Sequence, residues 1–309
     1  MKNGIFVLVF LASALTRIFL LGSAPERLVK SLGQDLTCAV FSDQNYENEN
    51  GNQYDLYIPA GLDRTQNQNL ILYIHGGSFN SGSKADGETW CRYYAAQGYI
   101  TASVDYTLQM HGKDASIYQM NKEIENAVRA IRQRTEELGY KLDRMAIAGG
   151  SAGGCLALIY AYRDADTSPL PVKMVFEAVG PGSFHVEDWG IFGLDQSPEV
   201  AAGLFSVMSG QALTPEDITS GAYLEAVKPI SADRWVTKDT VPSVLCYGAH
   251  DKMQPFAASK RLVSALEKNG VDYRYFVAKH SGHGLQNDNK VYMEYLDAVV
   301  EYLDKYMKD

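Results

Sequence analysis

A serine flanked by glycines, in the pentapeptide Gly149-Gly-Ser-Ala-Gly153, lies where an apolar run gives way to a helical stretch. The run before it, Met145 to Ala148, is typical of a buried parallel strand, and Leu156 to Tyr162 after it reads as the apolar side of a helix. A serine on a sharp strand-to-helix turn has a strained backbone, and side chains two residues away on either side would collide, so glycine is needed there. The first N–H groups of the helix point at the same spot as the serine hydroxyl. The pattern therefore predicts a strand–turn–helix unit that presents Ser151 as a nucleophile.

The composition excludes several classes of protein. Of the 309 residues, 46% are apolar and 21% are charged, which suits one large α/β domain that carries an insertion. The formal net charge is -9 and there is no basic run, which argues against nucleic acid as a partner. The four cysteines are too few for a disulfide framework, and no Cys or His spacing suggests a metal site. We therefore expect neither a metal nor an organic cofactor.

Residues 1–35 form an apolar N-terminal segment. Lys2 precedes an uncharged stretch, residues 4–16, that is shorter than the about 20 residues of a membrane-spanning helix but suits the core of a signal peptide. The alternative is an apolar helix that packs against the body of the protein or lies on a membrane, with Arg17 reaching the interface. Export or envelope association is favoured over a cytoplasmic location, and membrane contact is expected only through residues 1–22.

From residue 36 onward, apolar runs with the spacing of strands alternate with helical stripes. Eight runs predict strands: Leu36–Phe41, Tyr54–Ile58, Asn69–Ile74, Ile100–Val104, Met145–Ala148, Val172–Val179, Val241–Tyr247 and Asp272–Val277. Helical stripes lie between most of the later runs, and one more closes the chain. This alternation predicts a doubly wound, mostly parallel eight-stranded sheet in one α/β domain over residues 36–309, with the first strands antiparallel.

Residues 183–238 interrupt the alternation. They show no strand pattern, only short helix-like pieces rich in large apolar side chains, which would be costly to leave exposed. We therefore expect a small helical cap inserted at the carboxyl edge of the sheet, where ligands bind in folds of this kind. Within it, Trp189, Phe205 and Met208 are the candidates for the wall of a substrate pocket.

Residues able to activate Ser151 lie at the ends of later predicted strands. A serine hydroxyl needs a base to take its proton, and the base needs a carboxylate to hold it in one tautomer. Asp251 directly follows a buried strand, and His283, bracketed by glycines, lies in the loop after the next strand. The chain order of serine, aspartate and histidine is the one that this strand–turn–helix motif requires. His280 is the second candidate for the base, and His250 is the third.

A glycine-rich loop after the third predicted strand can supply backbone N–H groups to the same place. In His75-Gly-Gly-Ser78, the N–H groups of Gly76 and Gly77 are unhindered, and Ala152 supplies another at the start of the helix. No lysine follows and no GxGxxG is present, so a phosphate-binding loop is not indicated. We expect Gly76, Gly77 and Ala152 to form an oxyanion hole, with His75 bracing the loop by hydrogen bonding.

Together these motifs resemble those of the α/β-hydrolase carboxylesterases. The resemblance runs from Leu36 to the C-terminus and rests on His75-Gly-Gly, Val104-Asp-Tyr106, Asp143-Arg144 ahead of Gly149-Gly-Ser-Ala-Gly-Gly154, Gly180-Pro181, Gly248-x-x-Asp251 and His283-Gly. The chain is similar to the hormone-sensitive-lipase-like branch and to the feruloyl or acetyl esterase-like branch. It departs from the former at Ser78, Gly150 and Thr107, where that branch usually has a small residue such as glycine, an acidic residue and an arginine.

The resemblance implies a serine hydrolase that cleaves small-molecule carboxylic esters through an acyl-enzyme on Ser151. Amide hydrolysis, as in formamidase-like or peptidase-like relatives of the fold, is the alternative, and a non-catalytic ligand-binding protein is the third possibility. If the cap forms the pocket, its modest length predicts a preference for short acyl groups, from acetyl to butyryl.

Overall fold

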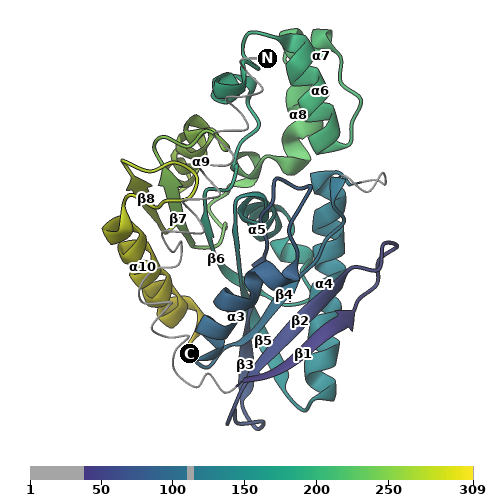
Figure 1. Cartoon of the computed structure of the whole chain (residues 1–309), viewed down its shortest axis with the longest axis vertical. Coiled ribbons are helices and arrows are strands. Elements are labelled where there is room, and N and C mark those ends of the chain that lie inside the picture. The colour runs from purple at the N-terminus through teal and green to yellow at the C-terminus, as the bar shows by residue number, and fades with distance from the viewer. Residues whose placement is uncertain (1–37, 110–114, 309) are drawn as a thin grey trace.

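The computed structural model describes residues 38–109 and 115–308, in which eight strands form one sheet (Figure 1). The strands are β1 (Cys38–Asn45), β2 (Gln53–Pro59), β3 (Asn67–Ile74), β4 (Ile100–Val104), β5 (Lys141–Gly150), β6 (Val172–Ala178), β7 (Ser243–Gly248) and β8 (Tyr273–Ala278). Their order in the sheet is β1-β2-β4-β3-β5-β6-β7-β8. The pairs β1–β2 and β2–β4 are antiparallel, and the other pairs are parallel. The predicted doubly wound, mostly parallel eight-stranded sheet is confirmed.

Helices cover both faces of the sheet. The α-helices are α3 (Glu88–Ala95), α4 (Ile117–Glu137), α5 (Ala152–Arg163), α6 (Pro198–Ser209), α7 (Pro215–Ser220), α8 (Tyr223–Val227), α9 (Phe256–Lys268) and α10 (Asn289–Met307). The short 3₁₀ helices are η1 (Lys84–Gly87), η3 (Ala165–Thr167), η4 (Val186–Phe192), η5 (Lys228–Ile230) and η6 (Ala232–Trp235). Helices α3 and α10 pack on one face, and α4, α5 and α9 pack on the other (Figure 1).

The two faces follow from the alternation of side chains along each strand. In β3, Leu70, Leu72 and Ile74 are buried in the core beneath α4 and α5. Their neighbours Ile71 and Tyr73 point the other way, into the cluster beneath α3 and α10. The carboxyl ends of the parallel strands thus lie between two separate layers of helices, and any site at that edge can open to either layer.

Helix α5 is the innermost helix. Every residue from Ala152 to Tyr162 is buried, which explains why its sequence has no polar face. Glycine lets it start against the sheet itself, because a Cβ on Gly153 would lie 2.0 Å from the carbonyl oxygen of Ile74. The N-terminus of α5 is therefore fixed directly behind the turn that follows β5.

Residues 183–238, which we call the cap, contain the helices η4, α6, α7, α8, η5 and η6 and no strand. Figure 1 shows α6, α7 and α8 gathered at one end of the molecule, away from α3 and α10. Helices α6 and α7 each end at a glycine in the left-handed region, Gly210 at φ 74° and Gly221 at φ 81°. These stops keep the cap helices short.

Aromatic side chains fill the inside of this cap. The cap aromatic cluster consists of Phe184, Trp189, Phe205 and Tyr223, all of them buried. Phe184 stacks on Trp189 with ring centroids 5.3 Å apart, and Phe205 meets both rings edge-on and stacks on Tyr223. The indole N–H of Trp189 donates to the carbonyl oxygen of Ser183 at 3.0 Å. The cluster continues the hydrophobic core beneath α4 and α5 into the cap.

The expected N-terminal segment, residues 1–35, lies outside the described residues, and so does the expected membrane contact through residues 1–22. Within the part of the chain that is described, no helix combines the length and the apolar character needed to cross a membrane. Export and anchoring stay predictions from the sequence.

Candidate active site

The structure brings Ser151, His283 and Asp251 into one chain of hydrogen bonds. Ser151 Oγ lies 2.8 Å from His283 Nε2, and His283 Nδ1 lies 2.7 Å from Asp251 Oδ2. The three residues follow the parallel strands β5, β8 and β7, so they meet at the carboxyl edge of the sheet. One imidazole nitrogen faces a carboxylate and the other faces a hydroxyl, which is the arrangement required of a base that takes a serine proton.

The backbone at Ser151 is strained in the way that the glycine pattern predicts. Its φ of 56° and ψ of -123° lie outside the regions that L-residues normally occupy. Its N–H donates to the carbonyl oxygen of Ala178 at 2.9 Å, and its own carbonyl accepts from the N–H of Cys155 at 3.0 Å. The turn is thus held from β6 on one side and from α5 on the other.

Asp251 is fixed by its own loop. Its side chain is fully buried, and Oδ1 accepts hydrogen bonds from the N–H groups of Met253 at 2.7 Å and Gln254 at 3.0 Å. These two bonds leave Oδ2 for the imidazole of His283, whose side chain is partly exposed. The Asp251 carboxylate is therefore held by three hydrogen bonds, one of them to the imidazole of His283.

The other candidate histidines point elsewhere. His280 is largely exposed, and its Nδ1 lies 2.9 Å from a carboxylate oxygen of Asp288. His250 is also exposed, and its backbone N–H donates to the carbonyl oxygen of Ser281. Of the candidate bases that the structure describes, His283 is the one in contact with the serine hydroxyl.

The loop after β3 approaches the serine closely. A Cβ on Gly76 would lie 3.3 Å from Ser151 Cβ. Gly77 has a φ of 113°, which favours glycine, and a Cβ there would lie 2.1 Å from the carbonyl oxygen of Ser81. Both glycines line the same cavity as Ser151, and Ala152 is the first residue of α5. Gly76 and Gly77 thus border the cavity at Ser151, and Ala152 follows the serine in the chain; their role as an oxyanion hole stays a prediction.

His75 braces this loop. Its ring stacks on Tyr106 with centroids 4.3 Å apart, its Nδ1 lies 2.7 Å from the carbonyl oxygen of Gly76, and the Tyr106 hydroxyl donates to the His75 carbonyl oxygen at 2.9 Å. Burial lowers the pKa of His75, so the imidazole is neutral at physiological pH. A neutral, stacked ring supports the loop without adding charge beside the serine.

A cavity of about 760 Å³ opens beside Ser151 on the face covered by α3 and α10. Two stacked aromatic pairs line part of it: Tyr73 from β3 and Trp90 from α3 stack at 5.8 Å, and Tyr292 and Tyr295 from α10 stack at 5.7 Å. Sequence reasoning missed these residues. Strand alternation places Tyr73 on this face, but nothing in the sequence shows that the two helices leave space there.

None of the three predicted pocket residues lines this cavity. Trp189 and Phe205 belong to the cap aromatic cluster, and Met208 is partly buried against the same core. The physical reason is that short helices must bury their apolar faces against one another. The wall beside Ser151 therefore comes from β3, α3 and α10 in place of the cap.

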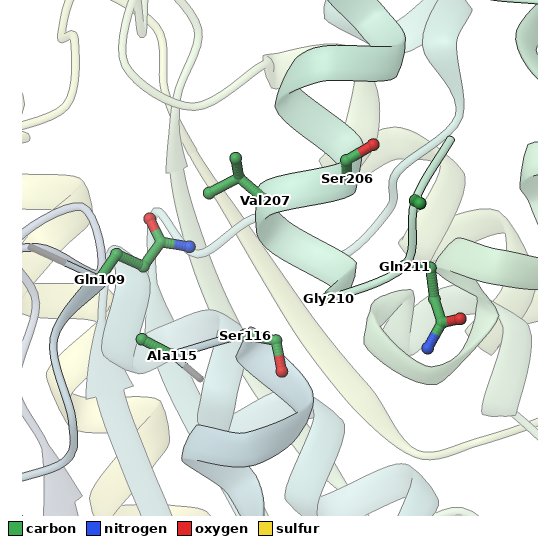
Figure 2. A pocket seen from close by; sticks show the side chains of 8 residues that line it. Gln109, Ala115, Ser116, Ser206, Val207, Gly210 and Gln211 are labelled. Atoms are coloured by element: carbon green, nitrogen blue, oxygen red, sulfur yellow. The ribbon is translucent and has the colours of Figure 1, made fainter. Parts of the chain in front are cut away.

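A second cavity, of about 390 Å³, lies between the cap and the start of α4 (Figure 2). It is lined by the segment before α4 and by the C-terminal end of α6 with the residues that follow: Gln109, Ala115, Ser116, Ser206, Val207, Gly210, Gln211 and Ala212. It shares no lining residue with the cavity at Ser151. Of these two cavities, the first is the one that Ser151 and His283 line.

Across residues 38–109 and 115–308, no group of three or more His, Cys, Asp or Glu side chains has the arrangement to hold a metal ion. Cys155, in the first turn of α5, is fully buried, and burial raises the pKa of its thiol well above the ordinary range. It is an inert structural thiol.

Solved structures with this fold include esterase 2 of Thermogutta terrifontis. Its propionate-bound form is 21% identical in sequence, with a TM-score of 0.66 over 89% of this chain and 96% of that one. Its butyrate-bound form is 20% identical, with a TM-score of 0.66 over 88% and 95%. At such identities the likeness shows the fold alone.

Curated relatives match parts of the chain. Esterase LipI of Mycobacterium tuberculosis is 32% identical over 119 residues, which are 38% of this chain and 36% of LipI. A probable isoprenylcysteine alpha-carbonyl methylesterase of Oryza sativa subsp. japonica is 25% identical over 251 residues, which are 77% of this chain and 55% of that protein. The chain thus spans about half the length, or less, of these relatives.

One family model covers the greater part of the chain. It matches residues 54–266, from β2 into α9, which include Ser151 and Asp251 but end before His283. The match and the α/β-hydrolase architecture agree with the resemblance of the sequence motifs to carboxylesterases. The chain belongs to the BD-FAE family of α/β hydrolases.

Proposed function

We propose that this protein is a serine hydrolase that cleaves carboxylic esters of small molecules. The observation that carries the proposal is the continuous hydrogen-bonded chain from Ser151 through His283 to Asp251, beside a cavity that aromatic side chains line in part. Relatives named as an esterase and as a probable carboxylic ester hydrolase support the ester class. In this proposal Ser151 is the nucleophile, His283 the general base and Asp251 the carboxylate that orients it.

The reaction follows from this geometry. As Ser151 Oγ bonds to the ester carbonyl carbon, its proton passes to His283 Nε2, and Asp251 stabilises the imidazolium that forms. The carbonyl oxygen becomes an oxyanion that accepts hydrogen bonds from backbone N–H groups of the loop after β3 and of Ala152. Collapse breaks the bond to the alcohol, which leaves with the proton from His283. Water then cleaves the acyl-enzyme by the same two steps and releases the acid.

We further propose that short acyl groups, from acetyl to butyryl, are preferred. Support comes from the solved structures of Thermogutta terrifontis esterase 2 with propionate and with butyrate bound. In this chain the acyl group would enter the cavity that Trp90 and Tyr292 help to line. Each buried CH₂ adds about 0.8 kcal/mol of favourable transfer until the chain meets the aromatic walls and is rejected.

The test combines labelling with a substrate series. A fluorophosphonate probe should label Ser151 and no other serine, as read by peptide mass spectrometry. p-Nitrophenyl esters of increasing acyl length should show the highest kcat/KM at short chains, and the matched p-nitroanilide should be cleaved far more slowly. Labelling at another serine would refute the nucleophile, a faster anilide would favour the amide hydrolase, and neither labelling nor turnover would favour a ligand-binding protein.

We also propose that the apolar N-terminal segment directs export or envelope association. Support comes from the uncharged stretch that follows Lys2. Cell fractionation of the full chain, beside a variant that lacks residues 1–24, tests this. The full chain should enter the envelope or exported fraction and the truncated one should not; an equal cytosolic distribution of both would overturn the proposal.

A further inference from the structure

Glu177 is a buried carboxyl group directly beside the nucleophile turn. It lies near the end of β6, pairs in register with Gly149 of β5, and has no exposed surface. Among the described residues, no lysine, arginine or histidine forms an ion pair with it or counters its charge. A carboxylate in such surroundings would be an uncompensated buried charge, which is very costly.

The hydrogen bonds around Glu177 are complete only when the group keeps its proton. The N–H of Gly180 donates to Glu177 Oε2 at 2.7 Å, and the Tyr247 hydroxyl donates to the carbonyl oxygen of Gly180 at 2.7 Å. The same hydroxyl lies beside the carboxyl group, yet Oε1 accepts no hydrogen bond. As the neutral acid, Glu177 can donate from Oε1 to the Tyr247 oxygen. That donation closes a ring of three hydrogen bonds and leaves no polar atom unpaired.

These hydrogen bonds hold a strained turn, residues 178–180, whose backbone is bonded to that of Ser151. The carbonyl oxygen of Ala178 accepts from the N–H of Ser151 at 2.9 Å. The next residue, Val179, has a φ of 53°, which is unusual for a β-branched side chain, and it lines the cavity. Gly180 then packs against α5 so closely that a Cβ there would lie 2.6 Å from the N–H nitrogen of Cys155. Two strained residues, Ser151 and Val179, thus lie on segments joined by one backbone hydrogen bond.

We propose that Glu177 is a positioning residue for the nucleophile. As the neutral acid it locks the Ala178–Gly180 turn to Tyr247 and to the first turn of α5, and through that turn it fixes the backbone of Ser151. It touches neither substrate nor reacting atoms. The inference rests on the proposed function, because the placement of the Ser151 backbone matters for turnover only if Ser151 is the nucleophile.

The surroundings predict that this lock opens at alkaline pH. Burial raises the pKa of Glu177 to about 8, against the opposing influences of the nearby Tyr247 hydroxyl and of the Gly180 N–H. The titratable groups that face it stay neutral there because burial raises the pKa of each: Cys155 and Tyr162 of α5, Cys246 and Tyr247 of β7, Tyr275 of β8 and Tyr295 of α10. The folded state holds this proton more tightly than the unfolded chain. The contribution of the protonated Glu177 to the free energy of unfolding is therefore complete at acid pH, falls as the pH rises, and is lost above about pH 8.

The experiment measures Ser151 labelling by a fluorophosphonate, together with kcat and KM for p-nitrophenyl butyrate, from neutral to alkaline pH. Wild type should lose labelling rate and kcat near pH 8 while still folded by circular dichroism, with KM little changed. Glu177→Gln, whose amide can donate to Tyr247 and accept from Gly180, should match wild type at neutral pH and lack this alkaline loss. Glu177→Ala should lower kcat by up to about 10²-fold at every pH, as misplaced catalytic groups do.

Asp233→Asn is the matched control. Asp233 is in η6 at the base of the cap; its side chain is only 6% exposed, and burial raises the pKa of its carboxyl group to about 7. Its removal should leave the alkaline loss in place. The proposal is overturned if Glu177→Gln keeps the wild-type loss, or if folded Glu177→Ala labels at the wild-type rate. If Glu177→Ala does not fold, the pH profile of Glu177→Gln decides. If wild type labels at Ser151 but cleaves no ester, the proposed function fails, while the labelling rates still test Glu177.

Discussion

The cap and the cavity beside Ser151 are both rich in aromatic side chains, and they use them differently. In the cap aromatic cluster, the ring of Phe205 contacts three other rings and is completely buried. Beside Ser151, stacked pairs such as Tyr73 and Trp90 border about 760 Å³ of open space. Aromatic content therefore marks where a chain buries surface, but the packing of helices decides whether buried rings meet one another or a ligand.

The helices explain the difference. The cap helices α7 and α8 have 6 and 5 residues, too short to be stable alone, so they fold by burying their apolar faces together. Helix α3 packs on β2, β3 and β4, whereas α10 packs on β5 to β8. Between these two helices the carboxyl ends of β3 and β5 stay open, and Ser151 lies at the end of β5. The predictions below test this division of roles.

The largest effect is expected at the serine itself. Ser151→Ala should lower kcat by about 10⁴–10⁶-fold, because the hydrogen-bonded chain acts as a unit and only oxyanion and binding contributions remain. The melting temperature should stay near that of wild type, since the fold does not depend on the hydroxyl. His280→Ala is the matched control and should retain activity, because that side chain is exposed and bound to Asp288. Substantial turnover by Ser151→Ala would place the nucleophile elsewhere.

The next effect is on stability and belongs to the cap. Phe205→Ala should lower the free energy of unfolding by about 3–5 kcal/mol, the usual loss for a buried phenylalanine. Turnover of short esters by the folded fraction should change little, because this ring does not line the cavity at Ser151. Urea denaturation and kcat/KM measured on the same preparation separate the effect on stability from the effect on turnover. A shift in acyl-length preference with little loss of stability would mean that cap residues, including Phe205, form the acyl pocket.

The sequence predicted the catalytic edge better than the cavity, for a physical reason. The sites of Ser151, Asp251 and His283 were marked by local rules: a glycine pattern at a turn, or a polar residue directly after a buried strand. Such rules act over a few residues, and the structure brings the three side chains together. The cavity depends on a gap between α3 and α10, which are about two hundred residues apart in the chain. A gap between distant helices leaves no local pattern, so Trp90 and Tyr292 were not predicted.

A smaller effect is expected at the cavity wall. Trp90→Ala should shift the preferred acyl length upward, because each further CH₂ that the enlarged cavity accepts adds about 0.8 kcal/mol, or roughly fourfold in kcat/KM. The stability loss should be smaller than for Phe205→Ala, since Trp90 is only partly buried. Phe192→Ala, an exposed aromatic residue of the cap, is the control and should leave the chain-length profile unchanged. Identical profiles for Trp90→Ala and wild type would mean that the acyl group binds elsewhere.

The smallest effect tests the loop that joins the cavity to the core. Ser78 and Phe79 follow Gly77 with φ values of 54° and 63°, so both carry the steric cost of the left-handed region. That cost is about 1–2 kcal/mol for a residue with a Cβ, whereas glycine loses only about 0.5–1 kcal/mol of extra chain entropy on folding. Ser78→Gly should therefore raise the free energy of unfolding by roughly 0.5–1 kcal/mol, because the exposed serine side chain contributes no burial in return.

Phe79→Gly should lower the free energy of unfolding despite the same backbone strain, because the Phe79 ring is buried in the core and holds the loop in place. Urea denaturation of Ser78→Gly and Phe79→Gly measures the sign of the change in the free energy of unfolding for each. An increase in stability for Ser78→Gly with unchanged kcat would show that the strain is a consequence of anchoring Phe79, whereas a fall in kcat would show that the strained serine itself helps to place the N–H groups beside Ser151.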